Sequence, residues 1–315
     1  MSMERNTYTK IAYWYYTLGL TQDEIARRLS LTRQKVNQII SSLVDLGIVT
    51  ISIDTHERAF SELERSLENR FGLYEAIVVD DYGEEEFAIY RVASAAAQYL
   101  DETITRGMNI GVSWGSTLAE MAKKMTYHRK SGCCVIPMMG AQNMDQRMEM
   151  TDEVTRLMAN KLDCSSYMLY APVLVNHPET KQWLMQERAV SSAYERMKQC
   201  DVAFLGVGEL TEEATMFTRG ILTRDEVRRL RADGFVADLC MNPVRADGSW
   251  DGCFLRDRLI NADMEMLCSI KNVVAVVTGR KKTAAIRAAL ATGCINTLII
   301  DEKSAKLVLD EKQDV

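Results

Sequence analysis

The sequence lacks several features that other classes of protein need. No apolar run reaches the roughly 18 residues that a membrane-spanning helix requires, and the opening MSMERNTYTK has no apolar signal-peptide region. The eight cysteines include no CxxC pair, and no histidine stands at zinc-ligand spacing from them. We therefore expect a cytoplasmic protein without a metal site or membrane contact, whose cysteines are reduced and mostly buried.

A strong positive charge is also missing. The net charge is −6 over 315 residues, which argues against a protein coated in nucleic acid. The charge is uneven, because residues 1–50 carry +2 and the remainder carries −8. A slightly basic head on an acidic body fits phosphate binding by the head alone. The length suits two domains, one of them with a substantial core.

Two capped helices joined by a tight turn are predicted near the N-terminus. Thr21 and Glu24 have capping-box spacing, and Thr32 caps the following helix. A preceding helix over 10–20 closes near Gly19. Apolar residues recur at helical spacing: Ile11, Tyr15 and Leu18, then Ile25, Ala26 and Leu29, then Val36, Ile39, Ile40 and Leu43, with Leu31 of the turn pointing inward.

The outer face of the last of these helices has no Asp or Glu from residue 32 to 44. Its Arg, Lys, Gln and Asn side chains match the acceptors and donors of the DNA major groove. A solvated surface hairpin is the alternative, but an acid-free face is unusual for one. We expect these residues to contact double-stranded operator DNA: Thr21, Gln22, Thr32, Arg33, Gln34, Lys35, Asn37 and Gln38. A short strand in GIVTISI would form a wing.

The segment 55–73 reads as one amphipathic linker helix that ends at Gly72. Its apolar stripe is Phe60, Leu63, Leu67 and Phe71. The helix could pack on its own effector domain or pair with another subunit.

From residue 76 onward, apolar strands alternate with helices. Strands are predicted within 76–81, 108–115, 133–140, 201–208, 273–279 and 297–301. This alternation indicates an α/β fold with a doubly wound, mostly parallel, Rossmann-like sheet. Ligands of such sheets bind beyond the carboxyl ends of the strands, where several of these segments end in glycine.

One of these strand ends, GVSWGST (111–117), is the most informative. Gly115 allows a close backbone approach, and Ser116 and Thr117 begin a helix, which together favour a phosphate site over a merely tight turn. Lys282 follows another strand and could add a cation. Asp238 lies in an apolar stretch, where an unpaired carboxylate is costly, so we favour binding of sugar hydroxyls over a structural salt bridge.

Taken together, these stretches resemble the SorC-type family of bacterial transcriptional regulators over essentially the whole chain. The resemblance is carried by GLTQDEIARRLSLTRQKVNQII, GIVTISI, GVSWGSTLAEM, IPMMGA, DVAFLGVG, ADL and GRKKTAAIRAALATGCINTLIID. It implies a winged helix-turn-helix, here residues 1–54, a linker helix at 55–73, and an effector domain over 74–315 similar to sugar-phosphate isomerases and deaminases. It also implies a phosphorylated sugar as effector and a tetramer built from two dimers.

By motif position, the resemblance implies that Ser116 and Thr117 hold the phosphate, Asp238 binds sugar hydroxyls and Lys282 closes the site. The predicted effector site comprises Ser113, Trp114, Gly115, Ser116, Thr117, Gly140, Gly208, Asp238, Gly279 and Lys282.

The sequence thus predicts a regulator, repressor or activator, of a carbohydrate or polyol operon, acting as a homodimer or homotetramer. It would use no cofactor other than a small sugar or sugar-phosphate effector. The alternative is a sugar-phosphate isomerase or deaminase with an appended DNA-binding head. That chemistry needs a positioned acid/base pair, and the only histidines (His56, His128 and His177) stand away from the glycine-ended strands.

Overall fold

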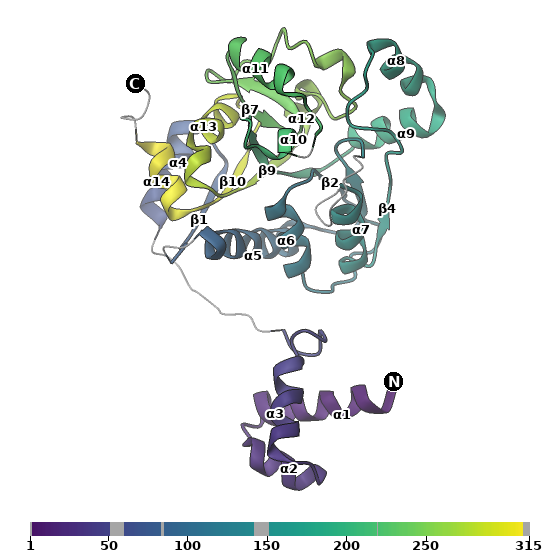
Figure 1. The fold of residues 1–315 in the computed structure, drawn as a ribbon, viewed down its shortest axis with the longest axis vertical. Coiled ribbons are helices and arrows are strands. Elements are labelled where there is room, and N and C mark those ends of the chain that lie inside the picture. The colour runs from purple at the N-terminus through teal and green to yellow at the C-terminus, as the bar shows by residue number, and fades with distance from the viewer. Residues whose placement is uncertain (1, 51–59, 83–84, 142–150, 219, 311–315) are drawn as a thin grey trace. The chain divides into compact units, whose positions relative to one another are not determined.

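The computed structural model describes residues 2–50, 60–82, 85–141, 151–218 and 220–310. The chain divides into two compact units, Met1–Glu57 and Arg58–Val315 (Figure 1). Both predicted architectures are present: a helical N-terminal unit and an α/β unit with a mostly parallel sheet.

The N-terminal unit is built from helices. They are α1 (Ser2–Ala12), which continues into the π-helical turn η1 (Tyr13–Thr17), α2 (Gln22–Leu29) and α3 (Arg33–Ser42). The predicted capping box of Thr21 and Glu24 is confirmed, and the Thr32 hydroxyl accepts a hydrogen bond from the Lys35 N–H. The predicted core is confirmed, with Tyr15, Leu29 and Leu31 partly buried against it. The exception is Leu18, which is exposed because the π-helical turn ends the regular helical spacing at Thr17. The wing prediction falls mainly on residues 51–54, outside the described residues.

The linker helix α4 (Ser61–Phe71) ends at Gly72, whose φ of +67° is the left-handed conformation of a helix C-terminus. It packs on its own α/β unit: Glu64 and Glu68 accept hydrogen bonds from the N–H groups of Val78 and Ala76, at 2.9 and 3.0 Å. Of the two alternatives that the sequence left open, the structure therefore shows contact with the chain's own domain.

The main sheet of the α/β unit has seven strands, all parallel, in the order β1-β10-β9-β5-β2-β3-β4. The strands are β1 (Glu75–Val79), β2 (Asn109–Val112), β3 (Cys134–Pro137), β4 (Ser165–Ser166), β5 (Val202–Leu205), β9 (Asn272–Val277) and β10 (Thr297–Asp301). Side chains alternate between the two faces, so that in β9 Val273 and Ala275 enter one core and Val274 and Val276 the other.

Helices cover both faces of this sheet (Figure 1). One core contains residues from α5 (Glu85–Thr103), α6 (Ser116–Lys124) and α7 (Thr151–Lys161). The other core contains residues from α4, α9 (Arg188–Met197), α13 (Thr283–Ala291) and α14 (Glu302–Leu309). The remaining helices are α8 (Pro178–Gln186), α10 (Thr215–Thr218), α11 (Arg224–Ala232), α12 (Met264–Ser269) and the short turns η2 (Arg256–Arg258) and η3 (Arg280–Lys282). Among the described residues, no helix is long and apolar enough to cross a membrane.

A second, antiparallel sheet was not predicted from the sequence. Its order is β6-β7-β8, formed by β6 (Val207–Glu209), β7 (Phe235–Leu239) and β8 (Asn242–Arg245). The glycine-rich stretch 201–208, predicted as one strand, is divided at Gly206 between β5 of the main sheet and β6 of this one. The hydrophobic pattern cannot reveal this division, because strand partners are set by tertiary contacts.

The cysteine prediction was wrong at one pair. Cys268 and Cys294 are joined in a disulfide, with their Cα atoms 4.5 Å apart. The pair is 26 residues apart in sequence, so spacing did not reveal it. Cys133, Cys134, Cys200, Cys240 and Cys253 are free and buried, and Cys164 is free and half-buried.

Candidate functional site

The predicted DNA-contacting residues lie together on α3 and at the start of α2. All are exposed except Gln22, which is half-buried. Contacts between the two helices fix this surface: Gln22 donates a hydrogen bond of 3.1 Å to the Asn37 side chain, and Arg33 lies 3.8 Å from the carboxylate of Asp23. The surface therefore presents cationic and amide groups from a helix that follows a tight turn, the geometry with which helix-turn-helix proteins enter the major groove.

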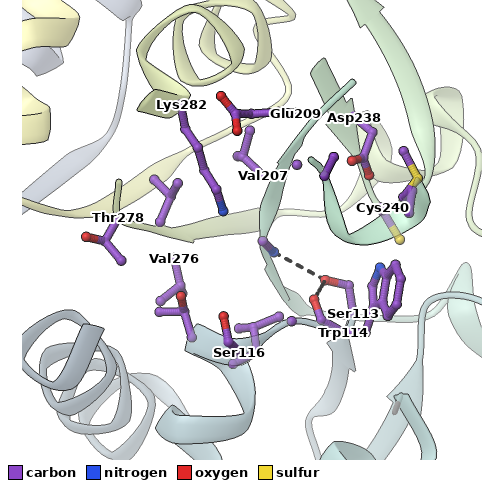
Figure 2. Close-up of a pocket in the computed structure, with 18 of the residues that line it drawn as sticks. Ser113, Trp114, Ser116, Val207, Glu209, Asp238, Cys240, Val276, Thr278 and Lys282 are labelled. Carbon is purple, nitrogen blue, oxygen red and sulfur yellow. Dashed lines mark hydrogen bonds between the residues drawn. The ribbon is translucent and has the colours of Figure 1, made fainter. Parts of the chain in front are cut away.

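The second candidate site is a cavity of about 180 Å³ at the carboxyl ends of β2, β5 and β9. The chain runs from β2 toward β3 and β4 on one side, and from β5 toward β9 and β10 on the other. The border of β2 and β5 is therefore a topological switch point, where the connections diverge and leave a crevice. The main-chain N–H of Ser113 donates to the Phe204 carbonyl at 3.1 Å, and the Ser113 hydroxyl accepts from the Gly206 N–H at 3.2 Å, which joins the two strand ends (Figure 2).

The N-terminus of α6 forms one wall of the cavity. Gly115 precedes it with a φ of +136°, a conformation that a side chain would strain, and no side chain caps the helix. The backbone N–H groups of the first turn have no acceptor within the helix. Together with the hydroxyls of Ser116 and Thr117, which line the cavity, they make this wall suited to an anion.

Lys282 supplies the cationic side chain of the cavity lining. Gly279, with a φ of +125°, turns the chain after β9 into η3. The buried carboxylate of Asp81 holds this region, because it lies 3.9 Å from Arg280 and 3.3 Å from Lys303 on α14. Lys282 then extends into the cavity, opposite Ser116 and Ser113 (Figure 2).

Asp238 on β7 is a buried carboxylate at the cavity, only 5% exposed. One oxygen accepts a hydrogen bond from the Met241 N–H at 3.0 Å, and the other lies against Gly208, where an added Cβ would come within 1.8 Å. Burial raises the pKa of Asp238 to about 6, although the Met241 N–H and the positive charge of Lys282 oppose this rise. Because Gly208 has no side chain, it leaves room for the Asp238 carboxylate.

The turn after Asp238 is held in an uncommon conformation. Cys240 and Met241 both have positive φ, 54° and 65°, between the paired strands β7 and β8. This is a two-residue hairpin turn of the kind that usually takes Asn or Gly. Asn261 donates to the Cys240 carbonyl at 2.8 Å, and Asn242 donates to the Leu239 carbonyl at 3.0 Å. These side-chain amides hold the turn in place, and with it the Met241 N–H that donates to Asp238.

Eight predicted effector-site residues line the cavity, and two do not. Gly140 lies instead against the backbone of residues 171–172, where an added Cβ would come within 2.6 Å of the Ala171 carbonyl oxygen. Gly279 positions Lys282 without lining the cavity. The sequence reasoning missed several lining residues: Leu118, Gly206, Val207, Glu209, Glu213, Ala214, Met216, Cys240, Val276, Val277 and Thr278. Glu209 directly follows the glycine-ended segment 201–208, and this position could have indicated that Glu209 lies near the site.

Among the side chains that could exchange protons with a ligand, Asp238, Glu209, Glu213 and Lys282 line the cavity. Of the histidines within the described residues, His128 and His177 do not line it, and His56 lies outside the described residues. Likewise, in the ranges that the structure covers, no group of three or more acidic, Cys or His side chains could hold a metal ion. Hydroxyls, a helix N-terminus, a lysine and a carboxylate can together bind an anion and hydroxyl groups.

Comparison with known proteins identifies the family. A sugar-binding domain model matches residues 56–310, and a winged helix-turn-helix DNA-binding model matches residues 19–50. The chain is 26% identical to the deoxyribonucleoside regulator of Bacillus subtilis, over 94% of this chain and 95% of that protein. It is also 26% identical to the erythritol catabolism regulatory protein EryD of Brucella abortus, over 96% of each. The chain belongs to the SorC family of transcriptional regulators.

Solved structures share this fold. The fold is similar to that of the full-length sorbitol operon regulator SorC of Klebsiella pneumoniae, with a TM-score of 0.74 and 23% identity over 98% of this chain and 99% of that one. A DeoR family transcriptional regulator from Listeria monocytogenes has a TM-score of 0.74 and 30% identity, over 80% of this chain and all of that one. The SorC family is one of regulators with sugar-binding domains, so the chain is a regulator and not an isomerase or deaminase.

Proposed function

We propose that this SorC-family regulator reads paired operator half-sites with α3 and the start of α2, and that a monophosphorylated sugar or polyol in the cavity changes its operator affinity. The protein would act in the cytoplasm, and the regulated genes would be those of a carbohydrate or polyol operon. The observation that carries the proposal is the cavity itself, where a helix N-terminus and Lys282 face a buried carboxylate, Asp238.

The charges around the cavity support a single phosphate. The N-terminus of α6 and Lys282 form one positively charged region, which stabilises an anion through aligned peptide dipoles and a cation. The acidic side chains that line the cavity are Glu209, Glu213 and Asp238. A second phosphate would lie near these carboxylates, and like charges repel strongly at the buried Asp238 and the half-buried Glu209, which are shielded from water. A bisphosphate is therefore disfavoured.

The carboxylates instead suit the hydroxyl groups of a sugar or polyol. The oxygen of Asp238 that does not accept from Met241 can accept a hydrogen bond from a ligand hydroxyl. The indole of Trp114, which is half-buried in the lining, can cover the apolar face of the carbon chain. The phosphate would thus determine the orientation, and the hydroxyl pattern would determine the specificity.

Linkage between the two sites would control transcription. A homodimer or homotetramer presents two recognition helices to two half-sites. If the effector binds one quaternary arrangement better, it shifts the protein toward that arrangement and changes operator affinity reciprocally. The usual coupling free energy of about 1–3 kcal/mol would change operator affinity about 5- to 150-fold.

The operator half of the proposal is tested by replacing Arg33 and Lys35 with Ala. We expect specific operator binding to be lost in a gel-shift or anisotropy titration, with thermal stabilisation by the effector unchanged. The matched control removes the same charge from α11, as Arg228→Ala with Arg231→Ala, both exposed in the α/β unit. If the control weakens operator binding as much as the α3 variant, the recognition surface is wrong.

The effector half is tested by a thermal-shift screen of sugar monophosphates, bisphosphates and free polyols. Lys282→Met removes a charged hydrogen-bond donor, worth about 1.5–3 kcal/mol, and should weaken the best monophosphate about 10- to 150-fold. Lys281→Met is the matched control, because Lys281 is exposed and is not part of the cavity lining. Equal losses in the two variants, tighter binding of bisphosphates, or turnover of a ligand would contradict the proposal.

A further inference from the structure

The disulfide between Cys268 and Cys294 lies outside both sites described above. Cys268 is in the last turn of α12, just before β9, and Cys294 lies between α13 and β10. Because β9 and β10 are parallel neighbours, the turns before them meet at the amino edge of the sheet, opposite the cavity. The Cα separation of 4.5 Å is within the range that a disulfide spans without backbone movement.

The two sulfur atoms differ in their access to solvent. Cys268 is exposed, whereas Cys294 is 3% exposed. Among the free cysteines that the structure describes, all but Cys164 are buried, and burial raises the pKa of Cys164 to about 12. Cys268 is therefore the thiol that a soluble oxidant reaches first, and Cys294 is placed to react next.

The cellular setting makes this pair unusual. A regulator that binds DNA works where glutathione and thioredoxin keep thiols reduced, and disulfides in that setting are usually transient and redox-sensing. The disulfide contributes nothing to the proposed DNA-reading surface or to the cavity lining.

We propose that Cys268 and Cys294 are a reversible peroxide-sensing pair. The Cys268 thiol loses its proton, the thiolate attacks a peroxide oxygen and the O–O bond breaks. Cys268 becomes a sulfenic acid, and the released hydroxide takes up the lost proton to form water. The Cys294 sulfur then attacks the Cys268 sulfur, forms the S–S bond and displaces the oxygen as a second water. Hydrogen peroxide takes up two electrons and the two thiols lose them. A cellular dithiol reverses the step by thiol–disulfide exchange, becoming a disulfide itself.

The disulfide restrains α13, which runs from the carboxyl ends of the strands, where the cavity lies, to their amino ends. This helix begins directly after Lys282 at the cavity and ends just before the turn that contains Cys294. Oxidation ties the carboxyl end of α13 to α12, and reduction releases it. The redox state of the pair therefore sets the mobility of α13, the helix that follows Lys282. This mobility could affect the proposed effector site, but it can be measured without any effector.

The test treats the reduced full-length protein with hydrogen peroxide and maps its thiols by mass spectrometry. We expect a product with two fewer free thiols per chain and no disulfide between chains, a peptide that links Cys268 to Cys294, and full recovery with dithiothreitol. The oxidised form should melt about 5–10 °C higher, because the cross-link restricts the unfolded chain, and amide exchange in α13 should slow.

Variants assign the effect to the pair. Cys268→Ser alters an exposed side chain, and Cys294→Ala fills the buried position with an apolar group; both should lose the cross-link, the melting shift and the slowed exchange. Cys164→Ser should behave as the wild type. The proposal is overturned if wild-type Cys268 and Cys294 stay unlinked, if another pair or an intermolecular bond forms instead, or if the cross-link leaves melting and exchange unchanged. Failure of sugar-phosphate binding would leave these results unaffected.

Discussion

The substitution Asp238→Asn tests whether the Asp238 carboxylate binds a ligand or stabilises the fold. Asn has nearly the same shape, and its side-chain oxygen can still accept the Met241 N–H, but it carries no charge. A carboxylate kept for a salt bridge would stabilise the fold, so its loss would be destabilising. A buried carboxylate that stays charged in order to bind a ligand destabilises the ligand-free protein. Replacing it with a neutral side chain should therefore stabilise the ligand-free protein.

The raised pKa of Asp238 sets the magnitude. Burial moves this pKa from the ordinary 3.8 to about 6. Each pH unit of such a rise corresponds to about 1.36 kcal/mol, so at pH 7.5 the buried charge reduces the free energy of unfolding by about 3 kcal/mol. Because the folded-state pKa is the higher one, the penalty is complete above pH 6 and disappears as the pH falls from 6 toward 3.8.

Thermal unfolding of both proteins without effector measures this cost. At pH 7.5 the Asn variant should melt roughly 5–10 °C above the wild type, and the difference should shrink by pH 5. The variant should also lose the effector response, since an Asp238 carboxylate accepts ligand hydroxyls better than an amide. A variant that melts below the wild type at pH 7.5 would refute the reasoning and point to a structural carboxylate.

Two further changes test the site and the head. Gly208→Ala would place a methyl group 1.8 Å from an Asp238 oxygen; overpacking of this kind costs about 1–3 kcal/mol. We expect lower thermal stability and loss of the effector response, whereas Gly206→Ala, with its nearest contact at 3.4 Å, should keep the wild-type melting temperature. Thr21→Ala removes the capping box and should cost the N-terminal unit about 1 kcal/mol, measured by urea unfolding of residues 1–57; an unchanged midpoint would mean that the cap does not stabilise α2.

Local patterns in the sequence determined the DNA-reading head. Capping spacing, apolar period and the acid-free face of α3 involve residues within one or two turns of each other, so they are readable without tertiary contacts. The same holds for the anion-suited end of α6, where Gly115, Ser116 and Thr117 are consecutive. Leu18 was misjudged because the π-helical turn Tyr13–Thr17 ends the regular helical spacing before it.

Only the tertiary structure decided how the cavity is completed. Asp238, Glu209 and Lys282 come from segments far apart in sequence, and the pairing of β6 with β7 brings the first two to the same edge. Gly140 has the same local pattern as Gly208, a glycine after an apolar strand, yet one packs on the backbone and the other makes room for a carboxylate. Cys268 and Cys294 likewise meet because β9 and β10 are neighbours in the sheet. The sequence by itself predicted what each segment forms and that a ligand site is expected at the strand ends, because these predictions depend on neighbouring residues. Which side chains meet there depends on strand order, and long-range contacts set that order.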